Sequence, residues 1–164
     1  MNEELLNLKQ RAAGLKKQHR KLVQKLQAMP SSKADELIHE AHEDVFACTD
    51  CLQCANCCKT TGPLFTDKDI ERIARYLKMR PAAFIERYLR VDEDRDYVLQ
   101  KVPCAFLGAD NYCSIYDVRP KACREYPHTD RRNMQEIMSL TLKNAAVCPA
   151  VLNILELVRE KVGK

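Results

Sequence analysis

The 164-residue chain has no tryptophan, only four glycines and few other aromatic residues. Sandwich and barrel folds need many tight turns between strands, so this composition argues against them and favours helices. Long apolar runs are also missing, because the longest one, residues 145–152, is far too short to span a bilayer. The length suits one domain with an apolar core plus an appendage rather than two large domains.

The N-terminus, MNEELLNLKQ, lacks the basic start and apolar middle of a signal peptide. We therefore expect a cytoplasmic protein with no membrane partner. Acidic residues are scarce at this end, since positions 1–30 hold seven Lys/Arg against two Glu. A mildly basic helix is most often a solvated face, so the charge alone disfavours nucleic acid as a partner.

Cysteine, in contrast, is abundant. There are nine in the chain, and five of them fall in the stretch CTDCLQCANCC, residues 48–58. In a reducing compartment structural disulfides are disfavoured, and an odd number of cysteines cannot all pair within one chain. Metal ligation is therefore the leading explanation, because a CxxC turn directs two thiolates at one ion. The adjacent Cys57 and Cys58 must point differently, which suits two sites, or one site plus a core position.

The cysteine stretch can be read in two registers. In the first, four cysteines from Cys48 to Cys58 reproduce the CxxCxxCxxxC spacing of bacterial ferredoxins, with Lys59 in place of their proline. In the second, the chain reads CxxCxxCC from Cys51 and continues with PCAFL, CSIY, RPKACREYP and CPA. These four segments add four distant cysteines, so separate elements are expected to supply long-range ligands.

In the second register, the order of these segments resembles the YkgJ-like CxxCxxCC cysteine-cluster family over roughly residues 46–155. Proteins of that family are described as zinc- or iron-chelating and are often called iron–sulfur cluster-containing. The resemblance leaves Cys48 as an extra thiol and places Ala55 where the family usually has glycine. It implies eight metal-binding cysteines here, namely Cys51, Cys54, Cys57, Cys58, Cys104, Cys113, Cys123 and Cys148.

Eight thiolates divide into two four-ligand sites, or serve one cluster plus a structural thiol group, and both arrangements stay open. The expected cofactor is an iron–sulfur cluster, with [4Fe–4S] favoured by the ferredoxin-like spacing, or zinc as its rival. Either centre leaves net negative charge on four thiolates, so cations and N–H donors are needed nearby. Arg119 and Arg124 flank Cys123 and are the cofactor-binding candidates, although Arg119 could equally pair with Asp117 or Glu125.

Apolar spacing predicts a long amphipathic helix from Leu5 to Met29, ended by Pro30. A second helix follows, with Ser31, Ser32 and Asp35 as its N-terminal capping residues, and the two form a helical hairpin. Their apolar seam packs on the protein's own core or serves as a dimer seam. The expected domains are residues 1–45, with the amphipathic helices, and residues 46–164, with the cysteine cluster.

After the cysteine stretch, Thr66 and Asp69 form a TxxD capping box that starts a helix near Asp67. Pro81 suits the first turn of the next helix. Asp117 is expected to cap a short helix. The remaining expected elements are strands at 97–99, 106–107 and 112–116, and helices at 118–125, 132–143 and 149–161. The predicted fold class is mainly α with a small β-hairpin (α+β), its loops gathered around the cysteines.

The predicted function is metal binding in an electron-transfer, redox or structural role. Catalytic residues are not predicted, because no nucleophilic triad, phosphate loop or GxGxxG turn is seen. The chain leans away from enzymes, although the family is related to flagellin lysine N-methylases. A further alternative is a zinc-stapled interaction module whose N-terminal helices bind a protein partner or self-associate. His39, His42 and His128 are expected on the surface or behind the ligands, and Cys48 is the candidate for a reactive thiol.

Overall fold

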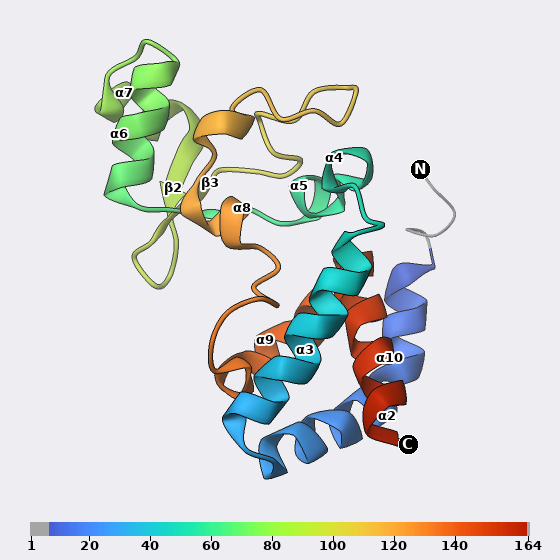
Figure 1. The fold of residues 1–164 in the computed structure, drawn as a ribbon. Coiled ribbons are helices and arrows are strands. Elements are labelled where there is room, and N and C mark those ends of the chain that lie inside the picture. Colours follow the sequence, from blue (N-terminus) through green and yellow to red (C-terminus); the bar gives the residue numbers. More distant parts are fainter. Residues whose placement is uncertain (1–6, 164) are drawn as a thin grey trace. The chain divides into compact units, whose positions relative to one another are not determined.

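The computed structural model describes residues 7–163 (Figure 1). The chain divides into two compact units. Unit 1 comprises residues 1–50 and 127–164, and unit 2 comprises residues 51–126. Helices dominate both units and a small three-stranded sheet lies in unit 2, which confirms the predicted fold class. Within residues 7–163, no helix combines the length and apolar character needed to cross a membrane.

All regular secondary structure in the described residues of unit 1 is helical. Pro30 separates the first two helices, because its extended backbone (φ −56°, ψ 138°) breaks the helical path between them. This confirms the two predicted N-terminal helices, except that Leu5 lies outside the described residues. The elements are α2 (Leu8–Ala28), α3 (Ser31–Phe46), η2 (Met134–Ile137, a 3₁₀ helix), α9 (Met138–Asn144) and α10 (Pro149–Gly163).

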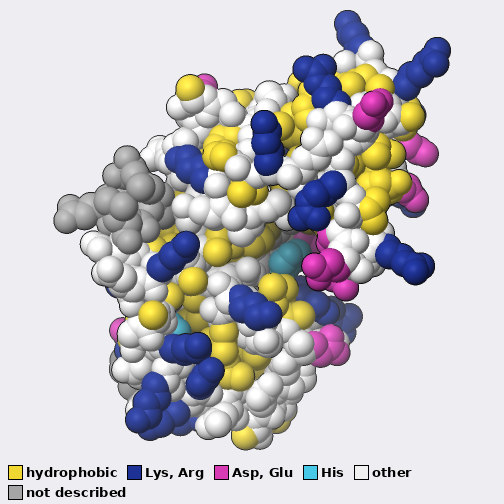
Figure 2. All heavy atoms as spheres, turned by 180° about the vertical axis from the view of Figure 1, so that it is seen from behind, with side chains coloured by type: hydrophobic (Ala, Val, Ile, Leu, Met, Phe, Trp, Pro, Cys, Tyr) yellow, Lys and Arg dark blue, Asp and Glu magenta, His cyan; other side chains and the backbone are white. Residues whose placement is uncertain are grey.

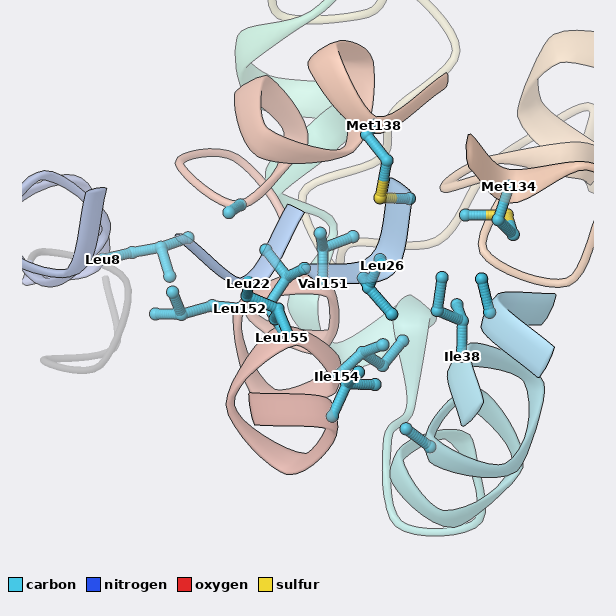
Figure 3. Packing of buried hydrophobic residues seen from close by; sticks show 14 residues of the cluster. Leu8, Leu22, Leu26, Ile38, Met134, Met138, Val151, Leu152, Ile154 and Leu155 are labelled. Atoms are coloured by element: carbon cyan, nitrogen blue, oxygen red, sulfur yellow. The ribbon is translucent and has the colours of Figure 1, made fainter. Parts of the chain in front are cut away.

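The core of unit 1 forms around α10, which contacts both α3 and α2 (Figure 1). In Figure 3, Leu22 of α2 points toward Leu152 and Leu155 of α10, while Ile154 points toward Ile38 of α3. All five side chains are almost completely buried. The apolar seam of α2 therefore packs on the protein's own core, which was one of the two predicted alternatives.

The predicted cap of the second helix is wrong. Among the described residues, no side chain caps α3, whose N-cap is Pro30. Asp35 instead reaches the segment before η2, where its carboxylate accepts hydrogen bonds from the backbone N–H groups of Asn133 and Met134, both at 2.8 Å. Asp35 thus ties two distant parts of unit 1 together.

Unit 2 consists of short elements. The helices are α4 (Cys51–Cys54), α5 (Asn56–Thr60), α6 (Asp67–Tyr76), α7 (Pro81–Tyr88), η1 (Tyr116–Val118) and α8 (Lys121–Glu125). The strands are β1 (Leu64–Phe65), β2 (Leu89–Val91) and β3 (Tyr97–Leu99), which form an antiparallel sheet in the order β1-β3-β2. The acidic residues 92–96 lie in the turn that joins β2 to β3.

A small aromatic core holds α6 and α7 against this sheet. Phe84 is completely buried, with its ring 6.1 Å from that of Phe106 and 6.0 Å from that of Phe65, centroid to centroid. The capping box of Thr66 and Asp69 at the start of α6 is confirmed, and so is the proline at the first turn of α7. These two features were readable because their signals are local.

Two predictions in unit 2 are wrong in detail. The strands expected at 106–107 and 112–116 reduce to one isolated bridge between Leu107 and Cys113. The helix expected at 118–125 splits into η1 and α8, because Pro120 holds Arg119 in extended backbone. Asp117 makes no capping bond to either piece in the part of the chain described here.

The compact units also divide the chain differently from the predicted domains. Residues 127–164 were grouped with the cysteine cluster on sequence, but they pack with the N-terminal helices in unit 1. The reason is that α10, apolar on most of its surface, needs partners on several sides, and α2 and α3 provide them. The 45/46 boundary itself stays a prediction about sequence domains.

Candidate metal centre

Seven of the nine cysteines lie in unit 2, and four separate segments carry them. Cys51 and Cys54 are the two ends of α4, Cys57 and Cys58 lie in α5, and Cys123 lies in α8. Cys104 and Cys113 belong to the loops between β3 and η1. Free thiols are found at Cys48, Cys54, Cys57, Cys58, Cys104, Cys113 and Cys123.

The bend between α4 and α5 lies at Ala55. This residue has left-handed backbone (φ 49°, ψ 17°) and is buried. Its N–H donates to the carbonyl of Cys51 at 2.9 Å, so it closes α4 before α5 starts in a new direction. Left-handed backbone is the reason that glycine suits this position, since a Cβ disfavours it. The iterated CxxC thiols therefore do not follow one helical face.

Cys104 is held beside α5 by its backbone. The N–H of Cys104 donates to the carbonyl of Cys58 at 2.7 Å. A tight turn follows, in which a Cβ on Gly108 would lie 2.6 Å from an Asp110 carboxylate oxygen, so a larger residue there would have to displace the Asp110 side chain. The amide of Asn111 in the same turn donates to the carbonyl of Gln53 in α4 at 3.0 Å. These bonds fix the loop that carries Cys104 and Cys113 against the CxxCxxCC segment.

Cys123 is positioned by a clamp from α6. The carboxylate of Asp69, which is 1 % exposed, accepts a hydrogen bond from the N–H of Lys121 at 3.1 Å. Arg72 pairs with Asp69 at 2.6 Å and donates to the carbonyls of Val118 and Arg119, at 3.3 and 2.9 Å. Asp69 and Arg72 therefore hold the segment that leads into α8.

Sequence reasoning found only half of this clamp. It identified Asp69 as the partner of Thr66 in a capping box, but it missed the bonds from Asp69 and Arg72 to residues 118–121. The available signal was the opposite charge of Asp69 and Arg72 three positions apart on one helix face. Their distant partners are backbone groups, which have no signature in the sequence.

Four thiols interact electrostatically in every pairwise combination: those of Cys58, Cys104, Cys113 and Cys123. They come from three regions, which are α5, the loops between β3 and η1, and α8. Burial raises the pKa of Cys104 and of Cys113, and the Cys58 thiolate raises both further. Burial also raises the pKa of Cys123 to about 12, with Cys58, Cys104 and Cys113 adding to the shift. Cys123 is the most exposed of the four residues, yet neighbouring protein atoms displace enough water to produce this shift.

Cys58 links this group to its neighbour in α5. A hydrogen bond with the Cys57 side chain, followed by burial, raises the pKa of Cys58 strongly. Mutual repulsion of this kind means that the thiols resist joint ionisation in the absence of a cation. A bound cation reverses the effect, because it stabilises several thiolates at once.

The surroundings supply the donors that thiolates require. Backbone N–H groups of Phe106 and Leu107 donate to the Cys104 sulfur, and that of Ile115 donates to the Cys113 sulfur. Each of these bonds lowers the pKa of the thiol that accepts it. Such N–H donors are a regular part of cysteine-ligated metal sites.

Of the two predicted cations, Arg119 is near the thiols. Its positive charge lowers the pKa of both Cys113 and Cys123. The guanidinium lies 3.9 Å above the centre of the Tyr116 ring and donates to the Tyr116 carbonyl at 2.7 Å, so it pairs with neither acid considered from sequence. Arg124 is exposed. Its cofactor-binding role stays a prediction.

The remaining sequence candidates lie in unit 1. Cys48 is exposed just after α3, and the half-buried Cys148 packs against the core of unit 1 before α10. His39 and His42 bond to the segment after residue 127, through the Arg131 carbonyl and the Thr129 hydroxyl, each at 2.8 Å. Both histidines therefore have a structural partner within unit 1.

The donor set in unit 2 has the chemistry of a four-thiolate site, in which Cys58, Cys104, Cys113 and Cys123 would be the ligands. Their sulfurs do not already stand around one point, since in residues 7–163 no three His, Cys, Asp or Glu side chains form a ready-made ion site. Binding would therefore need side-chain rotation toward a common centre. The roles of all eight cysteines as ligands stay a prediction.

Comparison with known proteins gives a family and one relative. Residues 50–149 match the CxxCxxCC family, described as “Putative zinc- or iron-chelating domain”. The chain is also similar to the “Uncharacterized protein MJ0661” of Methanocaldococcus jannaschii, with 37% identity over 82 residues. That match covers 48% of this chain and 44% of the relative, so this chain spans less than half of the relative's length. No solved structure matches.

Proposed function

Because the chain belongs to the CxxCxxCC family of zinc- or iron-chelating domains, we propose that unit 2 holds a four-thiolate metal centre ligated by Cys58, Cys104, Cys113 and Cys123. The observation that carries the proposal is that distant segments bearing these thiols are hydrogen-bonded together: the N–H of Cys104 donates to the carbonyl of Cys58 at 2.7 Å, and the clamp from α6 holds the segment before Cys123. The mutual electrostatic interaction of the four thiols agrees with this placement. Neighbouring thiols with raised pKa values resist ionising together, and a cation bound by all four would remove that resistance because it stabilises the thiolates.

The favoured centre is an iron–sulfur cluster with a redox or electron-transfer role. The N–H donors to Cys104 and Cys113 and the positive charge of Arg119 offset the negative charge of such a centre and tune its potential. Cys123 is exposed as a whole residue, although burial raises the pKa of its thiol, so electrons would have a short path from the centre to a partner at the surface.

Zinc is the alternative, because a closed set of four thiolates on short elements is also typical of structural zinc sites. Zinc would supply no redox chemistry, and its role would be to hold α5, α8 and the intervening loop together. The protein residues do the same work in both cases: the cysteines bind, the clamp of Asp69 and Arg72 orients α8, and Arg119 offsets charge.

Anaerobic purification of the full chain tests the proposal. An iron–sulfur centre predicts coloured protein with iron and acid-labile sulfide in equal amounts and colour loss in air. Colourless protein with stoichiometric zinc would keep the four-thiolate site and overturn the redox role. Folded protein with reactive thiols and no bound metal would overturn the whole proposal.

Single cysteine substitutions test which thiols are ligands. We expect Cys58→Ala, Cys104→Ala, Cys113→Ala and Cys123→Ala each to lose most of the bound metal. Cys48→Ala is the matched control, because Cys48 is exposed in unit 1 and should leave the metal content unchanged. Circular dichroism of the whole chain, to which the long helices of unit 1 contribute strongly, shows whether each variant still folds. Equal metal content in all five variants would contradict the assignment.

A further inference from the structure

Helix α2 carries a basic face that neither the metal nor the core of unit 1 uses. Its seven lysine and arginine side chains are all exposed, and the helix contains no Asp or Glu. Within residues 7–163, none of these seven pairs with a carboxylate. They are Lys9, Arg11, Lys16, Lys17, Arg20, Lys21 and Lys25.

The basic side chains lie on the side of α2 that faces away from the core. At 3.6 residues per turn, the buried Leu8, Leu22 and Leu26 occupy one face, and most of the charges fall on the opposite one. Figure 2 shows lysine and arginine side chains gathered below the grey N-terminal residues, over the part of the surface where α2 lies. The charges extend along roughly 24 Å of helix, at 1.5 Å per residue.

The centre of this face is shallow and lacks large side chains. A hollow lies over Ala13 and Gly14, with Lys16, Lys17, Arg20 and Lys21 at its rim. Nothing on Gly14 restricts access, since a Cβ there would meet no atom within 4 Å. A linear partner can therefore approach the helix backbone closely while four positive charges flank it.

We propose that this face of α2 binds the phosphate backbone of a nucleic acid without reading its sequence. Closely spaced lysines and arginines on an otherwise polar helix are the groups that contact phosphates. The charge is local, because the chain outside residues 1–30 carries about as many acids as bases. The charge count alone disfavours this partner, but in the described structure all seven charges are exposed and none of them pairs with an acid.

Two other kinds of partner fit this face less well. An interfacial membrane helix must bury an apolar face in the bilayer, and the apolar face of α2 is already packed into the core of unit 1. Protein interfaces are enriched in aromatic residues and depleted in lysine, whereas α2 has lysines and no aromatic residue except the buried His19. A nucleic-acid backbone needs only the charges.

The test measures binding of the full chain to a fluorescent 20-base-pair DNA duplex and to a single-stranded RNA by anisotropy at several salt concentrations. We expect micromolar affinity at low salt and a steep loss of affinity as salt rises. The test variant combines Lys16→Gln, Lys17→Gln, Arg20→Gln and Lys21→Gln. Removing four phosphate contacts should lower affinity by about 100-fold or more and reduce the salt slope by about 3 to 4.

The matched control removes the same charge from unit 2, at four exposed side chains that make no ion pair in the described part of the chain. It combines Lys68→Gln, Arg75→Gln, Arg90→Gln and Lys101→Gln. We expect this control to change affinity by less than about threefold. Since glutamine is a good helix former, α2 should persist in the test variant, and circular dichroism checks this. If it does not fold, the pairs at 16/17 and 20/21 are replaced separately, each with about half the effect on slope.

Three results would overturn the proposal. The first is no binding to either nucleic acid at 50 mM salt. The second is an equal loss in the test and control variants, which would assign the binding to overall charge. The third is binding to vesicles containing anionic lipid at salt concentrations where nucleic acid is not bound, which would make the partner a membrane surface. Because the metal centre is not involved, its loss in cysteine variants should leave this binding intact.

Discussion

Unit 1 buries fourteen hydrophobic residues in its described core cluster, whereas unit 2 buries nine. The first two helices of unit 1 have 21 and 16 residues, but the α-helices of unit 2 have between four and ten. Helices and hairpins this short are marginal in water unless tertiary contacts support them. Unit 2 also holds seven of the nine cysteines. If unit 2 holds the proposed metal centre, we expect apolar burial to stabilise unit 1 and bound metal to contribute to the stability of unit 2.

Metal removal should produce the largest difference in stability between the two units. When the metal is chelated from the purified protein, we expect the backbone amides of unit 2 to lose most of their protection from hydrogen exchange. A structural four-thiolate metal contributes on the order of 10 kcal/mol to folding, which is comparable to the whole stability of a small domain. The amides of α3 and α10 should stay protected. Mass spectrometry of deuterium uptake by peptide measures both units in one sample.

The reciprocal control weakens unit 1. Leu26 is fully buried between α2 and the rest of its cluster, so Leu26→Ala should cost about 2 to 5 kcal/mol. The metal content of this variant should not change. If chelation and Leu26→Ala each unfolded the whole chain at once, the comparison of the units would be broken.

The clamp from α6 should show the next largest effect. Asp69→Asn removes the charge that Arg72 pairs with and weakens the bonds from Thr66 and Lys121, while Asp69 is almost fully buried. We expect unit 2 to lose about 2 to 4 kcal/mol and to bind metal more weakly, because the segment leading to Cys123 is less well held. Urea unfolding and competition with a metal chelator measure the two effects. Asp67→Asn, at an exposed position two residues away in the same first turn of α6, should cost under about 1 kcal/mol.

The same clamp predicts a pH dependence. Burial by itself would raise the pKa of Asp69, but hydrogen bonds from Thr66, Arg72 and Lys121 hold it below its ordinary value. A carboxyl with a depressed folded pKa stabilises the fold fully above its unfolded pKa of about 3.9, and the gain is lost as pH falls through the lower folded value. The stability difference between the native chain and Asp69→Asn should therefore shrink below about pH 4. A difference that stayed constant down to pH 2.5 would contradict this account.

Sequence reasoning succeeded where the signal was local and failed where distant groups decided the structure. The end of α2 and the starts of α6, α7 and α10 followed from prolines, a capping box and apolar spacing. Asp35 was misassigned because its partners, the N–H groups of Asn133 and Met134, lie about a hundred residues away. The packing of residues 127–164 with α2 and α3 was missed for the same reason, since apolar spacing names a buried face but not its partner.

The candidate site shows the same limit. The candidate thiols followed from cysteine spacing and the family resemblance, and Arg119 was a candidate because it flanks Cys123. The charge of Arg119 does lower the pKa of Cys113 and Cys123. Neither could tell that Cys58 would be the member of the CxxCxxCC segment that interacts with the three distant thiols. That choice depends on the bend at Ala55, which sets the direction of α5 and was visible in sequence only as an unusual alanine.

The smallest predicted effects concern two residues of unit 2 that have left-handed backbone conformation. Lys78 (φ 56°) ends α6 in an exposed turn, with Met79 N–H bonded to the Ala74 carbonyl at 2.9 Å, and Ala55 (φ 49°) lies buried between α4 and α5. Glycine adopts this backbone without the strain of a Cβ, so Lys78→Gly should stabilise unit 2 by about 1 kcal/mol. Ala55→Gly should gain less, about 0.5 kcal/mol at most, because it also gives up a buried methyl group.

The urea unfolding midpoints of the metal-loaded Lys78→Gly and Ala55→Gly variants measure the two stability changes. The ranking is informative because the two residues share a backbone conformation but differ in burial, with Ala55 3 % exposed. If Ala55→Gly increased stability more than Lys78→Gly did, the strain energy of Ala55 in the turn between the cysteines would exceed the stability gained by burying its methyl group. Metal affinity should then rise in that variant alone, since Ala55 sets the direction of α5 and Lys78 lies in the turn after α6.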